Sequence, residues 1–369
     1  MAPDGFGGTL TAVQAAEAIA AGWRTAAPRD VVELAPLSDG GTGFVDVLAA
    51  ALPTASRHSL TVEDPLARPV EVSFLLDDST AYVESAQAAG LHLLTASERN
   101  PLITTSYGVG QLLRAALDAG ATRVVVGLGG SATNDGGAGM LAALGLQRLD
   151  ASGNRLVPGG AALRGVAELT GELDPRLTQV QLVAATDVDA PLIGLRGAAA
   201  VFGPQKGASA DDVQVLDCAL TRWADVLEAH LGVPVRDEPG AGAAGGMGGA
   251  LLAVAAVREP GIAMVQRLVG LDARVARADL VVTGEGRFDV TSLRGKVVSG
   301  VAAAAGAAAL PCLVLAGQVA VGQRELASAG VDAAYAVADA VGLEASLARP
   351  AEELAALAER VAREWSRSG

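Results

Sequence analysis

The chain has 369 residues, enough for one large domain or two, and 51% of them are apolar, so it can bury a sizeable core. Only 3% of the residues are aromatic, so that core must consist mainly of Ala, Val and Leu. The net charge of −14 argues against non-specific nucleic-acid binding, which depends on cations meeting phosphates, and means that any anion site must be built locally.

The two cysteines, Cys218 and Cys312, support neither a disulfide framework nor a Cys-based zinc site, which suits a reducing cytoplasm. Residues 1–23 lack the basic start of a signal peptide. Residues 297–323 carry no charge, but Pro311 divides them, and we expect a buried helix followed by a strand. We therefore expect a cytoplasmic protein with no membrane or nucleic-acid partner.

Short apolar stretches alternate with Ala-rich amphipathic stretches, which predicts an α/β fold with a mostly parallel sheet. In chain order the expected strands are 31–37, 122–130, 182–188, 278–286, 311–317 and 332–339. The expected helices are 44–52, 139–145, 296–305, 324–330 and 351–365. Residues 60–85 instead alternate polar and apolar residues around a Pro-bearing turn, as antiparallel strands do. At the start, APDGF is typical of a strand-to-loop junction, so either a strand of ordinary length would begin upstream of Met1 or this edge of the sheet lacks a strand.

The stretch GLGGSATNDGGAGMLAALG, residues 127–145, holds seven glycines and follows the strand at 122–130. Backbone N–H groups where a strand passes into a helix favour an anion, and glycines let it approach closely. Ser131, Thr133, Asn134 and Asp135 would then point at a ligand. A tight junction in which one of them caps the helix is the alternative.

Two known nucleotide-binding patterns can be compared with the glycine-rich parts of the sequence. Gly127, Gly129 and Ala132 fit G-x-G-x-x-A, with Asp150 about twenty residues later, so a dinucleotide-dependent oxidoreductase stays as an alternative. The signal is weak, because SATND is too polar for that turn. A P-loop is excluded before Lys296, because the required first glycine is Val290.

Acidic residues follow two further strands. Asp187 and Asp189 could hold Mg²⁺, or one could serve as a base. A turn in which the two carboxylates only cap the backbone is the alternative. Glu285, Arg287 and Asp289 follow the strand at 278–286, where ligands of open parallel sheets bind, with an exposed salt-bridged loop as the alternative.

The chain contains 25 Arg but only two Lys, Lys206 in GPQKG and Lys296 in RGK. A compact ammonium suits a phosphate site between glycines better than a planar guanidinium, so both lysines are candidates for phosphate contact. The three histidines fall outside all these patterns. Chemistry run by carboxylates, Lys, backbone amides and metal is typical of phosphoryl transfer.

These stretches, together with AVFGPQKGAS and PGAGAAGGMGGALLA, resemble the bacterial glycerate kinase family in the same order across nearly the whole chain. The resemblance implies ATP- and Mg²⁺-dependent phosphorylation of D-glycerate, with 2-phosphoglycerate favoured over 3-phosphoglycerate as product. It also implies a flavodoxin-like parallel-sheet domain from both chain ends, 1–62 plus 243–369. A second α/β domain, 63–242, would be inserted, with the site in a cleft between the two.

The N-terminal motifs depart from the family pattern. Gly5, Gly7 and Thr42 stand where the family has Ser, Lys and Glu. Loss of the lysine would remove a charge contact of roughly 1.5–3 kcal/mol. Three alternatives therefore stay open: a different small hydroxy acid as substrate, weak catalysis, or a binding or regulatory homologue. A homodimer also stays open.

The matching motifs carry over the candidate site residues. The candidate catalytic residues are Asp135, Asp187, Asp189 and Lys296, and Asp187 and Asp189 are also the candidate metal ligands. The candidates for nucleotide binding are Gly129, Gly130, Lys206, Gly284, Glu285 and Arg287. The candidates for substrate binding are Asp4, Asp39, Ser131, Thr133, Asn134 and Asp289.

Overall fold

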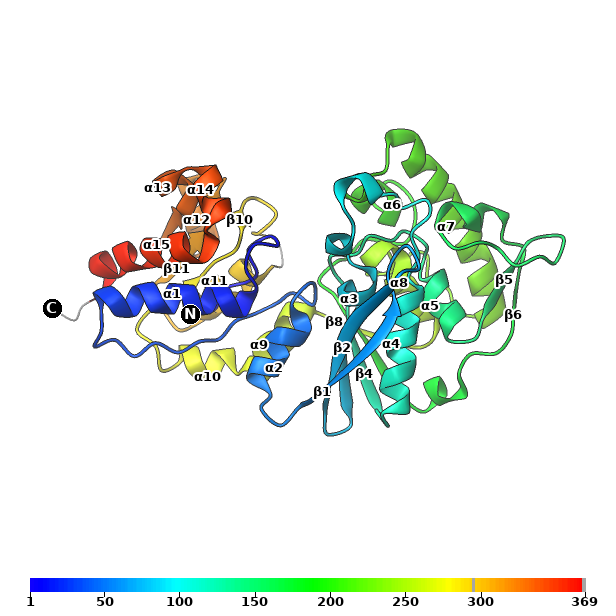
Figure 1. Ribbon diagram of the computed structural model, residues 1–369, viewed down its shortest axis with the longest axis horizontal. Helices are drawn as coiled ribbons and strands as arrows, with labels where there is room; N and C mark the ends of the chain where they lie inside the picture. The colour runs from blue at the N-terminus through cyan, green and yellow to red at the C-terminus, as the bar shows by residue number, and fades with distance from the viewer. Residues whose placement is uncertain (294–295, 367–369) are drawn as a thin grey trace. The chain divides into compact units, whose positions relative to one another are not determined.

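The computed structural model describes residues 1–293 and 296–366; Arg294 and Gly295 of the RGK motif, and residues 367–369, lie outside the described part. The chain forms two compact units (Figure 1). Unit 1 comprises Met1–Asp39, Asp46–Pro53 and Ile262–Gly369, and unit 2 comprises Gly40–Val45 and Thr54–Gly261. Unit 1 is therefore built from both chain ends. The domain boundaries expected at 62/63 and 242/243 stay a prediction, and the compact units place residues 243–261 in unit 2.

Unit 2 contains a six-stranded sheet in the order β1-β2-β3-β4-β7-β8. Its strands are β1 (Ser56–Glu63), β2 (Pro69–Asp77), β3 (Thr80–Glu84), β4 (Arg123–Gly127), β7 (Gln181–Ala185) and β8 (Val257–Glu259). Strands β3, β4, β7 and β8 are parallel neighbours, whereas β1–β2 and β2–β3 pair antiparallel. The predicted α/β class, with its parallel sheet and the antiparallel change near residue 60, is confirmed. A separate antiparallel pair joins β5 (Gln147–Leu149) to β6 (Glu168–Thr170).

The helices of unit 2 differ widely in length. They are α3 (Ala86–Ala89), α4 (Tyr107–Asp118), α5 (Ala138–Ala143), α6 (Ala198–Phe202), α7 (Ala210–Leu231) and α8 (Ala243–Ala253). Short 3₁₀ turns occur at Leu91–Leu93, Ala96–Glu98, Ala161–Gly165, Pro175–Thr178 and Pro204–Lys206. The longest helix, α7, begins at a capping box of Ser209 and Asp212 and ends at Gly232, whose φ of 73° favours glycine.

The core of unit 2 is made largely of Ala, Val and Leu, as the composition predicts, with Trp223 fully buried among them. Small residues allow the backbone segments to approach closely. A Cβ on Gly245 would lie 1.9 Å from the carbonyl oxygen of Thr133, so this position of α8 tolerates no side chain. Residues 244–246 kink α8 with positive φ angles at the same place.

Unit 1 contains a parallel sheet in the order β13-β11-β9, formed by Ala333–Ala336, Cys312–Ala316 and Val281–Thr283. The N-terminus extends this sheet, because Ala2 N donates to Val282 O (2.7 Å) and Asp4 N to Gly284 O (2.8 Å). The strand expected at 31–37 is an extended segment without a regular strand assignment, and it bonds the N-terminus through Ala35 N to Met1 O (2.8 Å). Pro36 cannot donate a hydrogen bond there. A short parallel pair joins β10 (Arg287–Phe288) to β12 (Gln318–Val319).

The other elements of unit 1 are mainly helices. They are α1 (Ala12–Ala26), α10 (Leu271–Val275), α11 (Val297–Ala307), α12 (Gln323–Ser328), α13 (Val337–Val341), α14 (Leu343–Ala348) and α15 (Pro350–Trp365). Helices α1 and α15 lie side by side (Figure 1) and bury Ile19, Trp23 and Leu357 against the sheet. Two more helices, α2 (Phe44–Ala51) and α9 (Gly261–Val269), contain residues of both units. The uncharged stretch that begins at 297 forms α11 and β11, as predicted, and none of the described helices is long and apolar enough to cross a membrane.

Candidate functional site

The candidate residues fall into two groups, one in each unit, and each group is described by itself. In unit 2 the SATND loop, residues 131–135, follows β4 at the carboxyl edge of the parallel strands, where ligands of open α/β sheets bind. The sequence suggested that this loop passes directly into a helix. It does not, because α5 begins only at Ala138. Its backbone is instead held by bonds to distant segments.

Three carbonyl groups in or next to this loop each accept a hydrogen bond from another part of unit 2. Gly130 O accepts from Leu91 N (2.8 Å), Ala132 O from Thr104 Oγ1 (3.0 Å), and Gly136 O from Trp223 Nε1 (2.9 Å). These bonds come from three parts of unit 2 that are far apart in sequence. The backbone of this segment is therefore positioned by contacts with other parts of unit 2.

Lys206 lies beneath this loop, with only 2% of its surface exposed. Its Nζ donates to Ser131 Oγ (2.9 Å) and to Thr133 O (2.6 Å). Burial lowers the pKa of Lys206 to about 7, and the nearby charge of Asp135 partly opposes that change. The ammonium thus lies next to the loop with two neutral acceptors and can change its charge near neutral pH.

Two side chains of the loop have unpaired polar atoms. Asn134 is fully buried, yet its Oδ1 and Nδ2 find no hydrogen-bond partner in the described part of the chain. The Oγ1 of Thr133, also fully buried, is likewise unpaired. Leaving such groups unpaired costs about 1–3 kcal/mol each, so their presence together indicates a place where a polar ligand completes the bonding.

Asp135 differs from its neighbours because its carboxylate is well bonded. Its Oδ2 accepts from Ser106 N and Oγ (both 2.9 Å) and from Gly139 N (3.1 Å), and its Oδ1 accepts from Gly137 N (3.2 Å). The carboxylate therefore ties the loop to the start of α4. Direct catalysis by Asp135 stays a prediction, and these contacts favour a positioning role. Ser106 was missed by sequence reasoning, because nothing local to it signals this contact.

Arg148, in β5, is a second residue that the sequence did not single out. Its Nη1 is buried without a partner among the described residues. Burial lowers the pKa of Arg148, and the charge of Asp135 opposes that shift. Asp135 is therefore the negative charge that both Arg148 and Lys206 experience.

The glycines of the apparent dinucleotide pattern serve a packing role. A Cβ on Gly127 would lie 2.4 Å from Gly40 O, and a Cβ on Gly129 would lie 2.6 Å from the Cα of Gly41. The same segment is held by Glu84, a buried residue missed by sequence reasoning, whose carboxylate accepts from Gly43 N and Val45 N (both 3.1 Å). These glycines allow Gly40 and Gly41 to pack against the segment that leads into the SATND loop, which explains the pattern without a dinucleotide.

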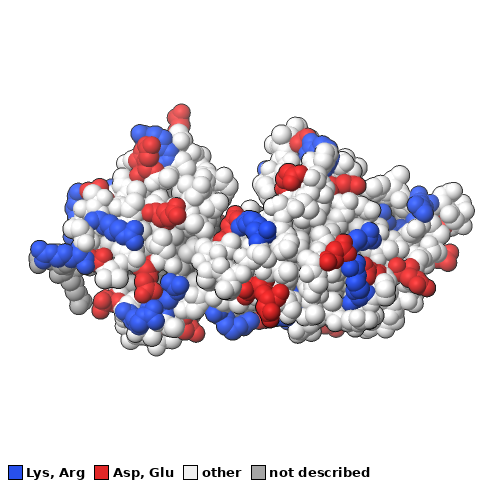
Figure 2. All heavy atoms as spheres, turned by 60° about the horizontal axis from the view of Figure 1, so that its bottom comes forward, with Lys and Arg blue, Asp and Glu red and all other residues white. Residues whose placement is uncertain are grey.

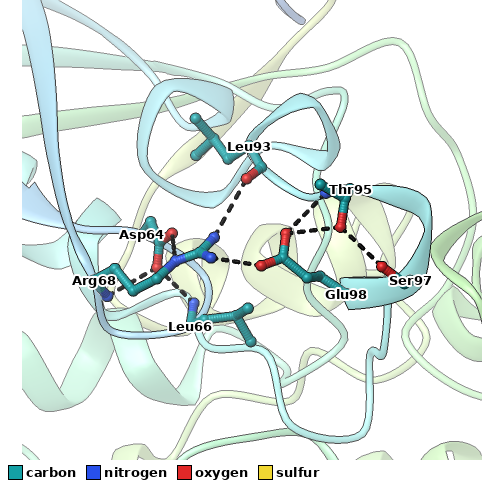
Figure 3. Close-up of polar contacts among 7 residues, drawn as sticks. All are labelled: Asp64, Leu66, Arg68, Leu93, Thr95, Ser97 and Glu98. Atoms are coloured by element: carbon teal, nitrogen blue, oxygen red, sulfur yellow. Dashed lines mark hydrogen bonds and ion pairs between the residues drawn. The ribbon is translucent and has the colours of Figure 1, made fainter.

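Arg68 holds in place residues 91–98, the segment that bonds the start of the SATND loop (Figure 3). Arg68 Nε lies 2.6 Å from Asp64 Oδ2, and its Nη1 lies 2.6 Å from Glu98 Oε1. Its Nη2 also donates to Leu93 O (3.4 Å). The guanidinium thus joins the β1–β2 turn to residues 91–98, the segment whose first N–H bonds Gly130.

The two candidate metal ligands lie in different surroundings. Asp187 is half-buried after β7, the parallel neighbour of β4, whereas Asp189 is exposed and pairs with Arg258. In the described part of the chain, no three His, Cys, Asp or Glu residues come close enough to hold a metal ion. The predicted Mg²⁺ site therefore stays a proposal.

In unit 1, carboxylates gather at the carboxyl edge of the sheet. Asp4 follows the N-terminal segment and Glu285 follows β9, and both are raised in pKa mainly by burial. The pKa of Glu285 is raised to about 7, and its Oε1 is buried with no partner among the described residues. Asp39 adds to the rise in the pKa of both carboxyls, and Lys296 opposes it.

The remaining candidates of unit 1 are less enclosed. Gly284 is required by packing, because a Cβ there would lie 2.0 Å from Leu315 O. Arg287 is 63% exposed and lies 3.4 Å from Asp289. Asp289 closes a turn by accepting from Thr291 N (2.8 Å) and Oγ1 (2.6 Å), and these bonds lower its pKa. Lys296 is half-buried at the start of α11.

Surface charge gives no other strong anion site on the face seen in Figure 2. The Lys and Arg side chains drawn there are interspersed with Asp and Glu and form no continuous basic area among the described residues.

A model of the glycerate kinase family matches residues 1–366. The chain belongs to this family. Glycerate kinase of Bacillus subtilis (strain 168) is 45% identical to it over 374 aligned residues, which cover 100% of this chain and 96% of that protein. Glycerate 2-kinase of Escherichia coli (strain K12) is 42% identical and is covered to 91%, with 93% of this chain aligned.

A solved structure agrees with these sequence matches. The crystal structure of a candidate glycerate kinase 2 from Salmonella typhimurium LT2 aligns with a TM-score of 0.79 at 41% identity. The alignment covers 98% of this chain and 96% of that one. The glycerate kinase family is therefore matched in fold as well as sequence, and the chain is a kinase rather than the dinucleotide-dependent oxidoreductase kept as an alternative.

The buried lysine of this glycerate kinase family member predicts a specific pH dependence of stability. Below pH 7, Lys206 is charged in both the folded and the unfolded chain. Between pH 7 and its ordinary value of 10.5, the unfolded chain holds a proton that the folded chain has released, so the free energy of unfolding rises with pH. Urea unfolding at pH 7 and pH 9.5 should show that Lys206→Met loses this rise.

The control is Arg196→Met, which removes an exposed cation of unit 2. It should keep the wild-type pH dependence. Parallel stability profiles of wild type and Lys206→Met would contradict the lowered pKa.

Proposed function

We propose that this protein phosphorylates D-glycerate with ATP and that the product is 2-phosphoglycerate. Family membership supports the reaction, and the name of the Escherichia coli relative, glycerate 2-kinase, supports the position of the phosphate. The observation that carries the proposal is the SATND loop of unit 2. A buried ammonium there lies beside an unpaired amide and an unpaired hydroxyl.

These groups fit a small hydroxy acid. The ammonium of Lys206 and the Nδ2 of Asn134 are donors that suit a carboxylate, which only accepts. The Oδ1 of Asn134 is an acceptor for a substrate hydroxyl, and Thr133 Oγ1 can donate or accept. Ser131 holds the ammonium through its Oγ (2.9 Å). Because the loop backbone is bonded elsewhere, the site is preorganised before the substrate binds.

Glu285 is the group that we assign to the proton transfer. A base works best with a pKa near the operating pH, and the pKa of Glu285 is raised to about 7. In the proposed reaction a carboxylate takes the proton of the reacting hydroxyl, and the unpaired Oε1 of Glu285 is the candidate for it. The hydroxyl oxygen then forms a bond to the γ-phosphorus. The bond from that phosphorus to the oxygen of ADP breaks, and ADP leaves. Lys296 and the acidic groups Asp4 and Asp39 set the charge around Glu285.

Mg²⁺ fits this chain as a companion of ATP rather than as a resident ion. Mg²⁺ is usually held by one or two carboxylates plus substrate phosphates, which agrees with the lack of a three-ligand cluster among the described residues. Asp187 would hold it, with Asp189 available only after leaving Arg258. When bound, the ion neutralises charge on the phosphates. The nucleotide contacts predicted for Gly129 and Gly130 in unit 2, and for Gly284 and Arg287 in unit 1, stay predictions.

The proposed reaction is tested by following ADP release with D-glycerate and a panel of small hydroxy acids. We expect D-glycerate to give the highest kcat/KM, because the three polar groups of the SATND loop match a carboxylate with an adjacent hydroxyl. Phosphorus NMR of the product should give the 2-phosphate. L-glycerate, glycolate and lactate serve as controls, and a better substrate among them, or no ADP release with any, would reject D-glycerate as the substrate.

Replacing the proposed base should remove activity without harming the fold. Glu285→Gln keeps the shape of the side chain but cannot take a proton, so kcat should fall about 100-fold or more. In the wild type, kcat/KM should fall as pH drops through about 7, because protonated Glu285 cannot act as a base. The exposed Glu325→Gln in α12 is the matched control and should behave as wild type. Retention of activity by Glu285→Gln would assign the proton transfer to another group.

A further inference from the structure

Unit 1 contains a small pocket whose lining residues, apart from Arg287, have no role in the proposed reaction. It has a volume of about 180 Å³ and lies beyond the ends of β9, β11 and β13. Gly286, Gln318 and Val337, which follow these three strands in turn, all line it. The carboxyl edge of a parallel sheet is where nucleotides bind in open α/β folds.

The walls of this pocket are apolar and differ in exposure. Phe6 and Val337 are core residues with 4% and 2% of their surface exposed. Leu343 and Leu347, from α14, are 48% and 56% exposed, so α14 presents two leucines to solvent. A flat apolar ring between these walls would cover them and gain the free energy of burying their surface.

The size of the pocket limits what can enter. Pockets that enclose a whole small molecule measure roughly 300–1,000 Å³, so 180 Å³ accommodates one moiety and leaves the remainder outside. A bicyclic base is a moiety of this kind, with a ribose and phosphates that continue beyond the rim.

Polar groups at the rim complement such a ligand. Gln318 lines the pocket, and a Gln amide can bond the N6 and N7 edge of adenine with one donor and one acceptor. Arg287, which also lines the pocket, is 63% exposed and held only by Asp289 at 3.4 Å. Such exposed pairs are weak, so the guanidinium is available to a phosphate.

We propose that this pocket binds the adenine of the phosphoryl donor, with Leu343 and Leu347 stacked on the ring and Gln318 at its polar edge. This inference rests on the proposed function only in taking ATP as the donor. It assigns Arg287, at the same rim, to the phosphates. It makes α14 a determinant of nucleotide affinity and Gln318 a determinant of the choice of base.

The test compares Leu347→Asp with Leu195→Asp, which places the same charge on a 96% exposed leucine of unit 2. Calorimetric titration with ADP should give a Kd at least about tenfold higher for Leu347→Asp and unchanged for Leu195→Asp. Inorganic tripolyphosphate, which has no base, should bind Leu347→Asp and wild type equally. Gln318→Ala should reduce the preference for ADP over GDP.

Each contrary outcome overturns the adenine site. Equal ADP affinity of Leu347→Asp and wild type would place the base elsewhere, and a parallel loss of tripolyphosphate binding would mean a general disturbance. Wild type that binds no ADP would also overturn it. Dimers in wild type that become monomers in Leu347→Asp, with ADP affinity unchanged, would identify the pocket as an interface between copies. The binding readout does not need glycerate, so a failure of the proposed reaction is seen separately, as absence of ADP release.

Discussion

The candidate site of unit 2 depends on one buried charge. The ammonium of Lys206 is withdrawn from water and bonded to Ser131 Oγ and Thr133 O, both neutral acceptors. Burial of a charge without a close counter-ion is costly, and the cost appears as a pKa lowered to about 7. An anionic ligand at this place would supply the missing counter-charge. The buried ammonium lowers the stability of the free protein, and for the same reason it favours binding of a carboxylate substrate.

Each unit contains a buried titratable group whose pKa lies near neutrality. Lys206 is a cation whose burial lowers its pKa to about 7, and Glu285 is an acid whose burial raises its pKa to about 7. Both lie near neutrality for the same physical reason, because burial disfavours whichever form is charged. In the proposed reaction the lysine is needed charged and the glutamate is needed ionised.

Sequence reasoning pointed to those residues of the candidate site that stand out within one segment, although it assigned Lys206 to the nucleotide and not to the substrate. The scarcity of lysine indicated Lys206, and the polar run after β4 indicated Thr133 and Asn134, whose buried polar atoms are unpaired. Local pattern also predicted the alternation of strands and helices, because hydrophobic periodicity is set residue by residue.

Contacts between distant segments could not be predicted in this way. Nothing near Ser106 or Glu84 in the sequence signals that one holds Asp135 and the other holds residues 43–45. Gly127 and Gly129 resembled a dinucleotide fingerprint, although they pack against Gly40 and Gly41. The central claim, that Lys206 binds the anionic substrate, is tested most directly by proton uptake. Calorimetry of D-glycerate binding at pH 8, in buffers of different ionisation enthalpy and in the Glu285→Gln protein, should show uptake of roughly half to one proton per site as Lys206 becomes charged. Binding without any proton uptake would contradict the account.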